Sequence, residues 1–259
     1  MRANRSGSTR AGTVLYEEWD LPQGNAVEAS LSRGSMFQPT GTVGTQFYGS
    51  SGGGGAPSHV LANGLATRRI TSAIATGGVF ATNKNFPLRA RWNAAPVVPV
   101  AYRSYRRFTF ECIAWRNQLT AVVAMEVGLT GNGTSLPGEA FNDPKYVFRS
   151  LLAENAGDWQ TSHRLVDGGA PTKVTTGVSP LVPAKMRWVF DEGPIPQLRM
   201  YLNDVLRLTA QDGTAIVLPT AIIAGTVADA SFGPALGMEG AVGDFGYVRD
   251  SYYRVEKLN

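Results

Sequence analysis

Cysteine and histidine are scarce in this 259-residue chain, which contains one cysteine, Cys112, and two histidines, His59 and His163. A single cysteine cannot form a disulfide within the chain, so packing has to supply the stability of the fold. The same scarcity excludes a zinc site built from histidine and cysteine. No phosphate-binding loop or calcium loop with the required spacing occurs either. We therefore expect neither a metal centre nor a cofactor.

Long apolar runs are also missing. The most apolar stretch, residues 215–230, is interrupted by Pro219 and Gly225. A membrane-spanning helix needs about 18 or more consecutive apolar residues. The N-terminus has no basic segment followed by an apolar one, which a signal peptide would require. We expect a chain that is made in the cytosol, has no membrane contact and carries no secretion address.

Charged residues make up only 17% of the chain, and the net charge is +4. Part of the basic excess lies near the N-terminus, where Arg2, Arg5 and Arg10 occur without an acidic residue. One interpretation is an extended arm over residues 1–12 that docks on an acidic neighbour, and the other is a solvated tail. No base-stacking motif accompanies the arginines, so nucleic acid is not an expected partner.

Motifs for catalysis are incomplete. Glycosidases with a β-sandwich fold use paired carboxylates, often as E-x-D-x-x-E along one strand. Here Glu18 and Asp20 are followed by Gln23 in place of the third acid, and Pro22 would interrupt an interior strand. Residues 49–53, GSSGG, match the pattern of a nucleophile elbow, but glycines stand where its helix should begin. We therefore expect no enzymatic activity.

Glycine (30 residues) and proline (15 residues) are frequent, and between them short segments alternate apolar and polar residues. The clearest is YRRFTFECIAWR, ending at Arg116, in which Phe108, Phe110, Cys112 and Ala114 would share one face. No amphipathic helix of ordinary length and no repeat of fixed period are present. Many short strands between turns are typical of an antiparallel β-sandwich.

A two-residue hairpin is expected at Asn203-Asp204. Leu198, Met200 and Leu202 alternate with polar residues before it, which predicts a half-buried strand. Asn and Asp tolerate the positive φ that such a tight reversal requires. The hairpin is therefore predicted to close a sheet, with the three apolar side chains turned inward.

The order of strand-like and turn-like segments also predicts the extent of the domain and the structure of two segments. Residues 13–259 are expected to form one domain after the arm of residues 1–12. Residues 145–154 should begin as a strand and offer the best place for a short helical turn. Residues 243–258 should form a pair of strands.

The segments 176–208, 232–255 and 14–20 together resemble concanavalin A-like (laminin-G-like) sandwich domains. In that family a long strand precedes a "vrfYvNG"-type hairpin, and the first strand pairs with the last. The overall layout is similar to that of structural proteins of tailed bacteriophages. The resemblance implies an all-β, antiparallel jelly-roll sandwich over residues 13–259.

The resemblance also implies a role, namely that of a non-enzymatic virion structural protein. We expect a capsid decoration (cement) protein that binds the capsid surface through its sandwich and its N-terminal arm. Its partners would be the major capsid protein or other virion subunits, as a homo-oligomer for which a trimer is one option. It would be located in the virion after assembly in the host cytoplasm. The candidate contact residues are Arg2, Arg5, Arg10, Tyr16 and Trp19, with core packing as the alternative for the two aromatic residues.

The alternative function is carbohydrate binding, as a tail-fibre or lectin-like module. Sandwich lectins bind glycans by stacking sugars on aromatic rings and by planar polar groups. Trp115, Trp159 and Trp188 are the candidate platforms, and burial in the core is the competing interpretation for each.

Overall fold

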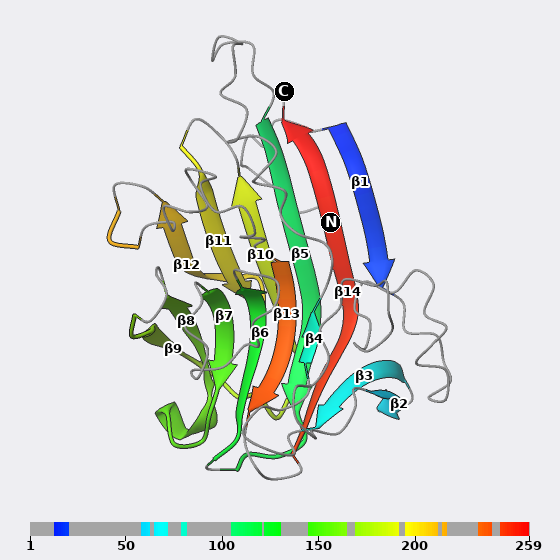
Figure 1. Ribbon diagram of the computed structural model, residues 1–259, viewed down its shortest axis with the longest axis vertical. Coiled ribbons are helices and arrows are strands. Elements are labelled where there is room, and N and C mark those ends of the chain that lie inside the picture. Colours follow the sequence, from blue (N-terminus) through cyan, green and yellow to red (C-terminus); the bar gives the residue numbers. More distant parts are fainter. Residues whose placement is uncertain are drawn as a thin grey trace, which may run out of the picture.

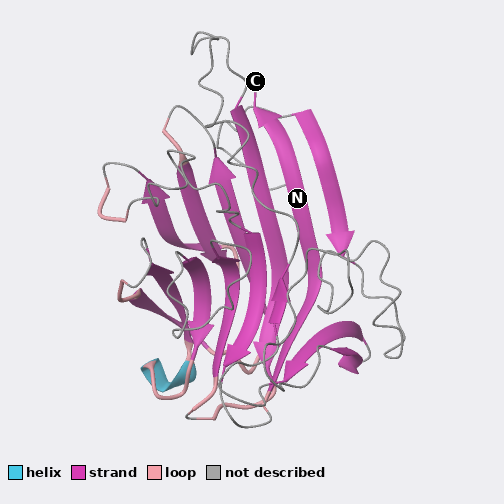
Figure 2. Cartoon of the chain, viewed as in Figure 1, coloured by secondary structure: helices cyan, strands magenta, loops and turns pink. Residues whose placement is uncertain are grey.

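The computed structural model describes twelve stretches of the chain: residues 13–20, 58–62, 65–71, 79–81, 105–120, 122–130, 145–164, 169–191, 195–211, 214–216, 233–239 and 244–258. Within them, strands pack as two layers (Figures 1 and 2). All pairings are antiparallel. The predicted all-β antiparallel sandwich is confirmed.

The larger described sheet has eight strands in the order β12-β11-β10-β5-β14-β3-β2, with β1 also paired to β14. Its strands are β1 (Thr13–Asp20), β2 (Ser58–Ala62), β3 (Leu65–Thr71), β5 (Tyr105–Arg116), β10 (Ala184–Asp191), β11 (Gln197–Leu202), β12 (Val205–Gln211) and β14 (Phe245–Leu258). The smaller described sheet has six strands in the order β4-β13-β6-β7-β8-β9. Its strands are β4 (Val79–Ala81), β6 (Ala124–Thr130), β7 (Lys145–Ser150), β8 (Trp159–Arg164), β9 (Thr172–Val178) and β13 (Gly233–Glu239).

The first and last strands pair, as the resemblance implied. β1 lies along β14 from the Thr13–Lys257 pair to the Asp20–Ser251 pair. β14 in turn lies beside β5 over most of its length (Figure 1). Strands from the two ends of the sequence therefore form the middle and one edge of the larger sheet.

The prediction of a strand pair over residues 243–258 is wrong, because β14 is one continuous strand of 14 residues. Asp250 has a φ of 50°, and the register against β5 shifts between Arg249 and Tyr252. An irregularity of this kind is a β-bulge, which bends a strand without reversing it. The bulge lies where β14 exchanges its partner β3 for β1.

The core lies between the two sheets and follows the predicted alternation. Phe108, Phe110, Cys112 and Ala114 all belong to the buried cluster. The Trp188 ring, from the larger sheet, stacks on Phe110 at 5.3 Å between centroids and meets Phe148, from the smaller sheet, edge-on at 5.4 Å. Burial raises the pKa of the Cys112 thiol far above its ordinary value, so Cys112 is an unreactive core residue.

The predicted hairpin is confirmed. Asn203 and Asp204 have φ values of 51° and 62°, the combination of a type I′ turn. Asn203 accepts a 2.9 Å hydrogen bond from the Lys185 amide through Oδ1 and donates one of 2.8 Å to the Lys185 carbonyl. Leu198, Met200 and Leu202 are buried, as expected.

The segment 145–154 begins with the predicted strand, β7. The short helical turn follows it, as a 3-10 turn over Asn155–Gly157. Within the described residues no helix is long and apolar enough to span a bilayer.

Candidate functional site

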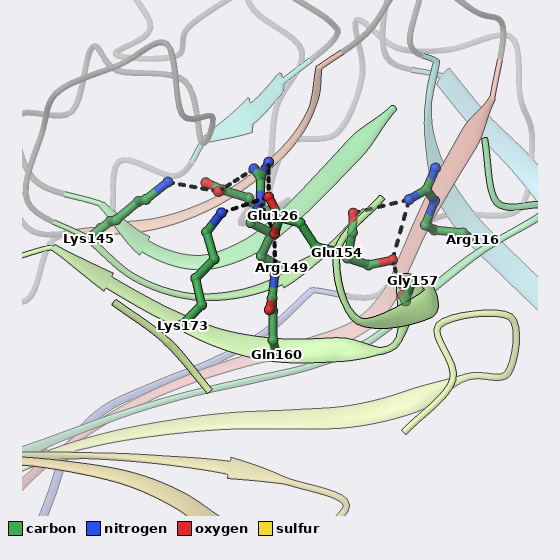
Figure 3. Close-up of polar contacts among 9 residues, drawn as sticks. Arg116, Glu126, Lys145, Arg149, Glu154, Gly157, Gln160 and Lys173 are labelled. Carbon is green, nitrogen blue, oxygen red and sulfur yellow. Dashed lines mark hydrogen bonds and ion pairs between the residues drawn. The ribbon is translucent and has the colours of Figure 1, made fainter. Parts of the chain in front are cut away.

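Charged side chains gather on the outer face of the smaller sheet, meaning the face turned away from the core. Glu126, Arg149 and Gln160 form one cross-strand row over β6, β7 and β8. Glu126 follows Met125 and precedes Val127, both of which face the core, so strand alternation places it outward. Together with Lys145, Glu154 and Lys173 these residues form what we call the carboxylate cluster (Figure 3).

Arg149 joins the two carboxylates of the cluster. Its Nη1 lies 2.9 Å from Glu126 Oε1, and its Nε lies 3.2 Å from Glu154 Oε2. Lys145 Nζ forms a second ion pair with Glu126 Oε1 at 2.7 Å. The side chains of Glu126, Lys145 and Arg149 are nearly solvent-inaccessible, which makes such charge-assisted bonds strong and their loss costly.

The other end of the cluster reaches solvent. Lys173 Nζ lies 2.7 Å from Glu154 Oε1, and Gln160 donates a hydrogen bond to Glu154 Oε2. The side chains of Glu154 and Lys173 are 22% and 24% exposed. A ligand that approaches this face would meet Glu154 and Lys173 first.

Ion pairs favour the ionised form of Glu154. Burial alone would raise the pKa of Glu154, but hydrogen bonds from Lys173 and Arg149 outweigh it and hold the pKa below its ordinary value. Glu126 accepts hydrogen bonds from Lys145 and Arg149. A general acid for glycoside cleavage needs a raised pKa, whereas the pKa of Glu154 is shifted downward.

Buried polar atoms on this face include two from Glu126 and Ser162 that have no hydrogen-bond partner in the described part of the chain. They are Glu126 Oε2 and Ser162 Oγ. Ser162 lies directly opposite Lys173 across β8 and β9, on the same face as Glu126. A buried acceptor without a partner costs free energy, and a bound water or ligand hydroxyl can remove that cost.

A second buried network joins the two sheets at one end of the sandwich (Figure 3). Arg116, the last residue of β5, forms a 3.1 Å ion pair with Asp244 and donates to the Ser150 carbonyl at 3.1 Å. Ser150 Oγ in turn donates to the Gly157 carbonyl at 2.7 Å. Burial lowers the pKa of Arg116, and the Asp244 carboxylate opposes that shift. The side chains of both charged residues are fully buried, so we assign this network a structural role.

The predicted partner-binding residues lie largely outside the described structure. Arg2, Arg5 and Arg10 fall outside the described residues, as does the whole predicted arm. Tyr16 and Trp19 lie in β1, opposite Val255 and Tyr252 of β14, where only their backbone is described. The partner-binding role of these five residues stays a prediction.

For two of the three candidate sugar platforms the competing interpretation, burial in the core, is confirmed. Trp159 and Trp188 are 0% exposed and belong to the core, where Trp188 donates a 3.0 Å hydrogen bond to the Tyr146 carbonyl. A ring packed between the sheets cannot stack on a sugar. Trp115 is also buried, at 6% exposed, but strand alternation places it on the outer face of the larger sheet, where it stacks on Tyr247 at 5.1 Å.

Glu18 and Asp20, from the incomplete glycosidase motif, lie in β1 of the larger sheet. Residues 49–53, which match the elbow pattern, lie outside the described residues. In the part of the chain that the structure describes, no three His, Cys, Asp or Glu residues come together as a metal site would require.

The sequence analysis missed the carboxylate cluster. The available signal was a charged residue inside otherwise apolar strands, as in AMEVGLT (β6) and KYVFRS (β7). Such residues are usual on the outer face of a strand, and only the register shows that Glu126 and Arg149 are direct neighbours.

Solved structures similar to this one include carbohydrate-binding and glucanase-like proteins. The carbohydrate recognition domain of Emp47p has 10% sequence identity and a TM-score of 0.54, over 98% of this chain and 100% of that one. A pseudo β-1,3-glucanase of Mycobacterium tuberculosis has 14% identity and a TM-score of 0.53, over 96% and 100%. A GH16 protein of the Bacteroides ovatus mixed-linkage glucan system, in complex with a product, has 8% identity and a TM-score of 0.50, over 93% and 100%.

The fold is that of a concanavalin A-like sandwich. Identities this low show a shared fold alone. No protein-family model matches the sequence, and no curated protein matches it. The three structures give no link to tailed bacteriophages, so the virion role also stays a prediction.

Proposed function

We propose that this protein is a non-catalytic glycan-binding domain whose site is the carboxylate cluster. The observation that carries the proposal is the position of Arg149, which forms ion pairs with both Glu126 and Glu154. Because its ion pairs hold the pKa of Glu154 below the ordinary value, Glu154 suits hydrogen-bond acceptance better than acid catalysis. The fold is one that carbohydrate recognition domains also have.

The cluster offers the groups that sugar hydroxyls bind. Carboxylates accept hydrogen bonds, while the Gln160 amide and the Lys173 ammonium donate them. The unpartnered Glu126 Oε2 and Ser162 Oγ add buried positions where a hydroxyl would complete the hydrogen bonding. The charges of the cluster are already paired with one another, which favours a neutral sugar over a charged one.

The proposal is tested on an array of neutral glycans, followed by titration of any glycan that binds. We expect saturable binding that weakens about ten-fold in each of two variants. Gln160→Ala removes an amide hydrogen-bond donor, and Lys173→Ala removes a charged one. Lys185→Ala is the matched control, because Lys185 is a partly exposed lysine of β10 in the other sheet. Absence of saturable binding, or equal weakening in all three variants, would contradict the proposal.

The absence of catalysis is tested separately. The protein is incubated with a panel of polysaccharides, and reducing ends are measured. We expect none to be released above the level of a Glu126→Gln, Glu154→Gln double variant. Release that depends on these two carboxylates would make the protein a glycosidase.

A second candidate function is the capsid decoration role. In its favour, the chain enters β1 at Thr13, beside Lys257 at the end of β14, and among the described strands β1 pairs only with β14. β1 therefore begins at an edge of the larger sheet, where a neighbouring subunit could make contact. The partner would be the major capsid protein or another virion subunit. If deletion of residues 1–10 leaves particle occupancy unchanged, the arm has no such role.

A further inference from the structure

Aromatic rings and arginines alternate on the outer face of the larger sheet. Trp115 of β5 lies directly opposite Tyr247 of β14, which lies opposite Arg69 of β3. Phe245 and Arg249 lie two residues to either side of Tyr247 and therefore share its face. We call these five residues the aromatic–arginine patch. They lie on the opposite side of the sandwich from the carboxylate cluster.

The rings and guanidinium groups of the patch stack on one another. The Arg69 guanidinium lies 4.5 Å from the centre of the Phe245 ring, and that of Arg249 lies 5.7 Å from the Trp115 ring. Trp115 and Tyr247 are stacked at 5.1 Å, with an angle of 15° between their planes. Stacking holds a guanidinium by its flat face and leaves its in-plane N–H groups to point sideways.

Those N–H groups have few partners. In the described part of the chain neither the Arg69 nor the Arg249 guanidinium donates a hydrogen bond, and the Nε atoms of both are buried without a hydrogen-bond partner. The Arg249 Nε forms a long ion pair with Asp250 Oδ2 at 3.4 Å, and the side chain of Asp250 is 50% exposed. Exposed ion pairs contribute little, so Asp250 can be displaced by a competing anion.

We propose that the aromatic–arginine patch is a second binding site, for a uronic acid residue of an acidic polysaccharide. A carboxylate matches the fork of a guanidinium and binds it with two parallel hydrogen bonds. The apolar face of the sugar ring can lie against the half-buried rings of Phe245 and Tyr247. The site extends the glycan-binding role proposed above and rests on it, but it uses none of the residues of the carboxylate cluster.

Charge on the same face disfavours a continuous polyanion such as nucleic acid. The outer face of the larger sheet also carries carboxylates. Glu111 lies between the core residues Phe110 and Cys112 and therefore points outward. Asp191 and Glu256 both pair with Arg107, which also points outward. A phosphate backbone needs a row of cations, and these carboxylates interrupt it. A sugar chain with separated carboxylates fits a patch with two arginines and adjoining rings.

The test measures binding of the intact protein to polygalacturonic acid by isothermal titration. We expect saturable binding that is lost when the polymer is fully methyl-esterified, because the ester removes the charge and keeps the sugar. Arg249→Ala should weaken binding about ten-fold, the usual effect of losing a charge-assisted hydrogen bond. Arg207→Ala is the matched control, since it removes an arginine from β12 of the same sheet and should change the affinity less than about two-fold.

Other outcomes would overturn the proposal. Equal weakening in Arg249→Ala and Arg207→Ala would mean that binding follows net charge alone. Tighter binding of poly-L-glutamate would indicate an acidic protein partner, and tighter binding of oligodeoxythymidine would indicate nucleic acid. Should Arg249→Ala fail to fold, as judged by its melting curve, Arg69→Ala removes the other stacked guanidinium and serves the same purpose.

The two glycan proposals fail separately. Gln160→Ala changes the carboxylate cluster and should leave the affinity for polygalacturonic acid unaltered. Neutral glycan binding without polygalacturonic acid binding would remove only the second site. Polygalacturonic acid binding through Arg249 without any neutral glycan binding would remove only the first.

Discussion

Arg116 and Asp244 are 128 residues apart in the sequence and form an ion pair with neither side chain exposed to solvent. Arg116 ends β5, and Asp244 immediately precedes β14. Through Ser150 of the smaller sheet the pair also connects the two layers. Arg149 of the carboxylate cluster directly precedes Ser150 in β7. The buried ion pair therefore lies next to the candidate site.

Breaking the Arg116–Asp244 pair should strongly destabilise the protein. We expect Asp244→Asn to lower the free energy of unfolding by about 3–5 kcal/mol, because it leaves a buried guanidinium without its counter-charge. Urea denaturation of the variant and the wild type measures the difference. The double variant Arg116→Met, Asp244→Leu should recover part of the loss, since it buries no charge. A single variant as stable as the wild type would show that solvent reaches the pair.

Gly128 should not accept a side chain. A Cβ atom at Gly128 would lie 2.5 Å from the Tyr146 carbonyl oxygen and 2.8 Å from Trp188 Cζ2, and its φ is +150°. Gly128→Ala should therefore lower the free energy of unfolding by about 1–3 kcal/mol or more, as overpacking of a core does. Gly177→Ala is the control, because its φ of +68° adds backbone strain while nothing lies within 4 Å. Its cost should be only about 1–2 kcal/mol.

Replacing Asp204 with glycine should stabilise the β11–β12 hairpin. Asp204 has a φ of 62°, which costs a non-glycine residue about 1 kcal/mol, and Asn-Gly is the preferred pair in this turn. Its ion pairs to Lys185 and Arg187, at 3.4 and 3.5 Å, involve a carboxylate that is 61% exposed and contribute little. We expect a higher melting temperature for Asp204→Gly and a lower one for Asp204→Ala. The reverse order would mean that the ion pairs outweigh the backbone strain.

Glu154 should make stability depend on pH in the acidic range. Its pKa is lowered in the folded protein from an ordinary value of 4.5, so its ion pairs stabilise the fold fully above that pH. As the pH falls from 4.5 through the lower folded pKa, the carboxylate is protonated and this contribution is lost. Glu154→Gln should be less stable than the wild type at pH 7, and its unfolding free energy should fall less steeply below pH 4.5. Parallel curves of urea stability against pH would contradict this assignment.

The sequence by itself determined the fold class and several of its parts. The alternation in YRRFTFECIAWR fixed which side of β5 faces the core, because side chains of a strand point to opposite faces in turn. Asn203-Asp204 fixed the hairpin through their tolerance of positive φ. Both features depend on residues close together in the chain, which is why local patterns are sufficient to predict them.

Tertiary structure alone decided the rest. A bulge at Asp250 made one long strand of a segment whose composition favours two, and the composition does not distinguish a bulge from a turn. The pairing of whole strands placed Trp159 and Trp188 in the core and Trp115 on the outer face. Glu126 became the neighbour of Arg149 through the register of β6 and β7, and Trp115 the neighbour of Tyr247 through that of β5 and β14. Register depends on the packing of residues far apart in the sequence, and a shift of one residue would turn every side chain of a strand to the other face.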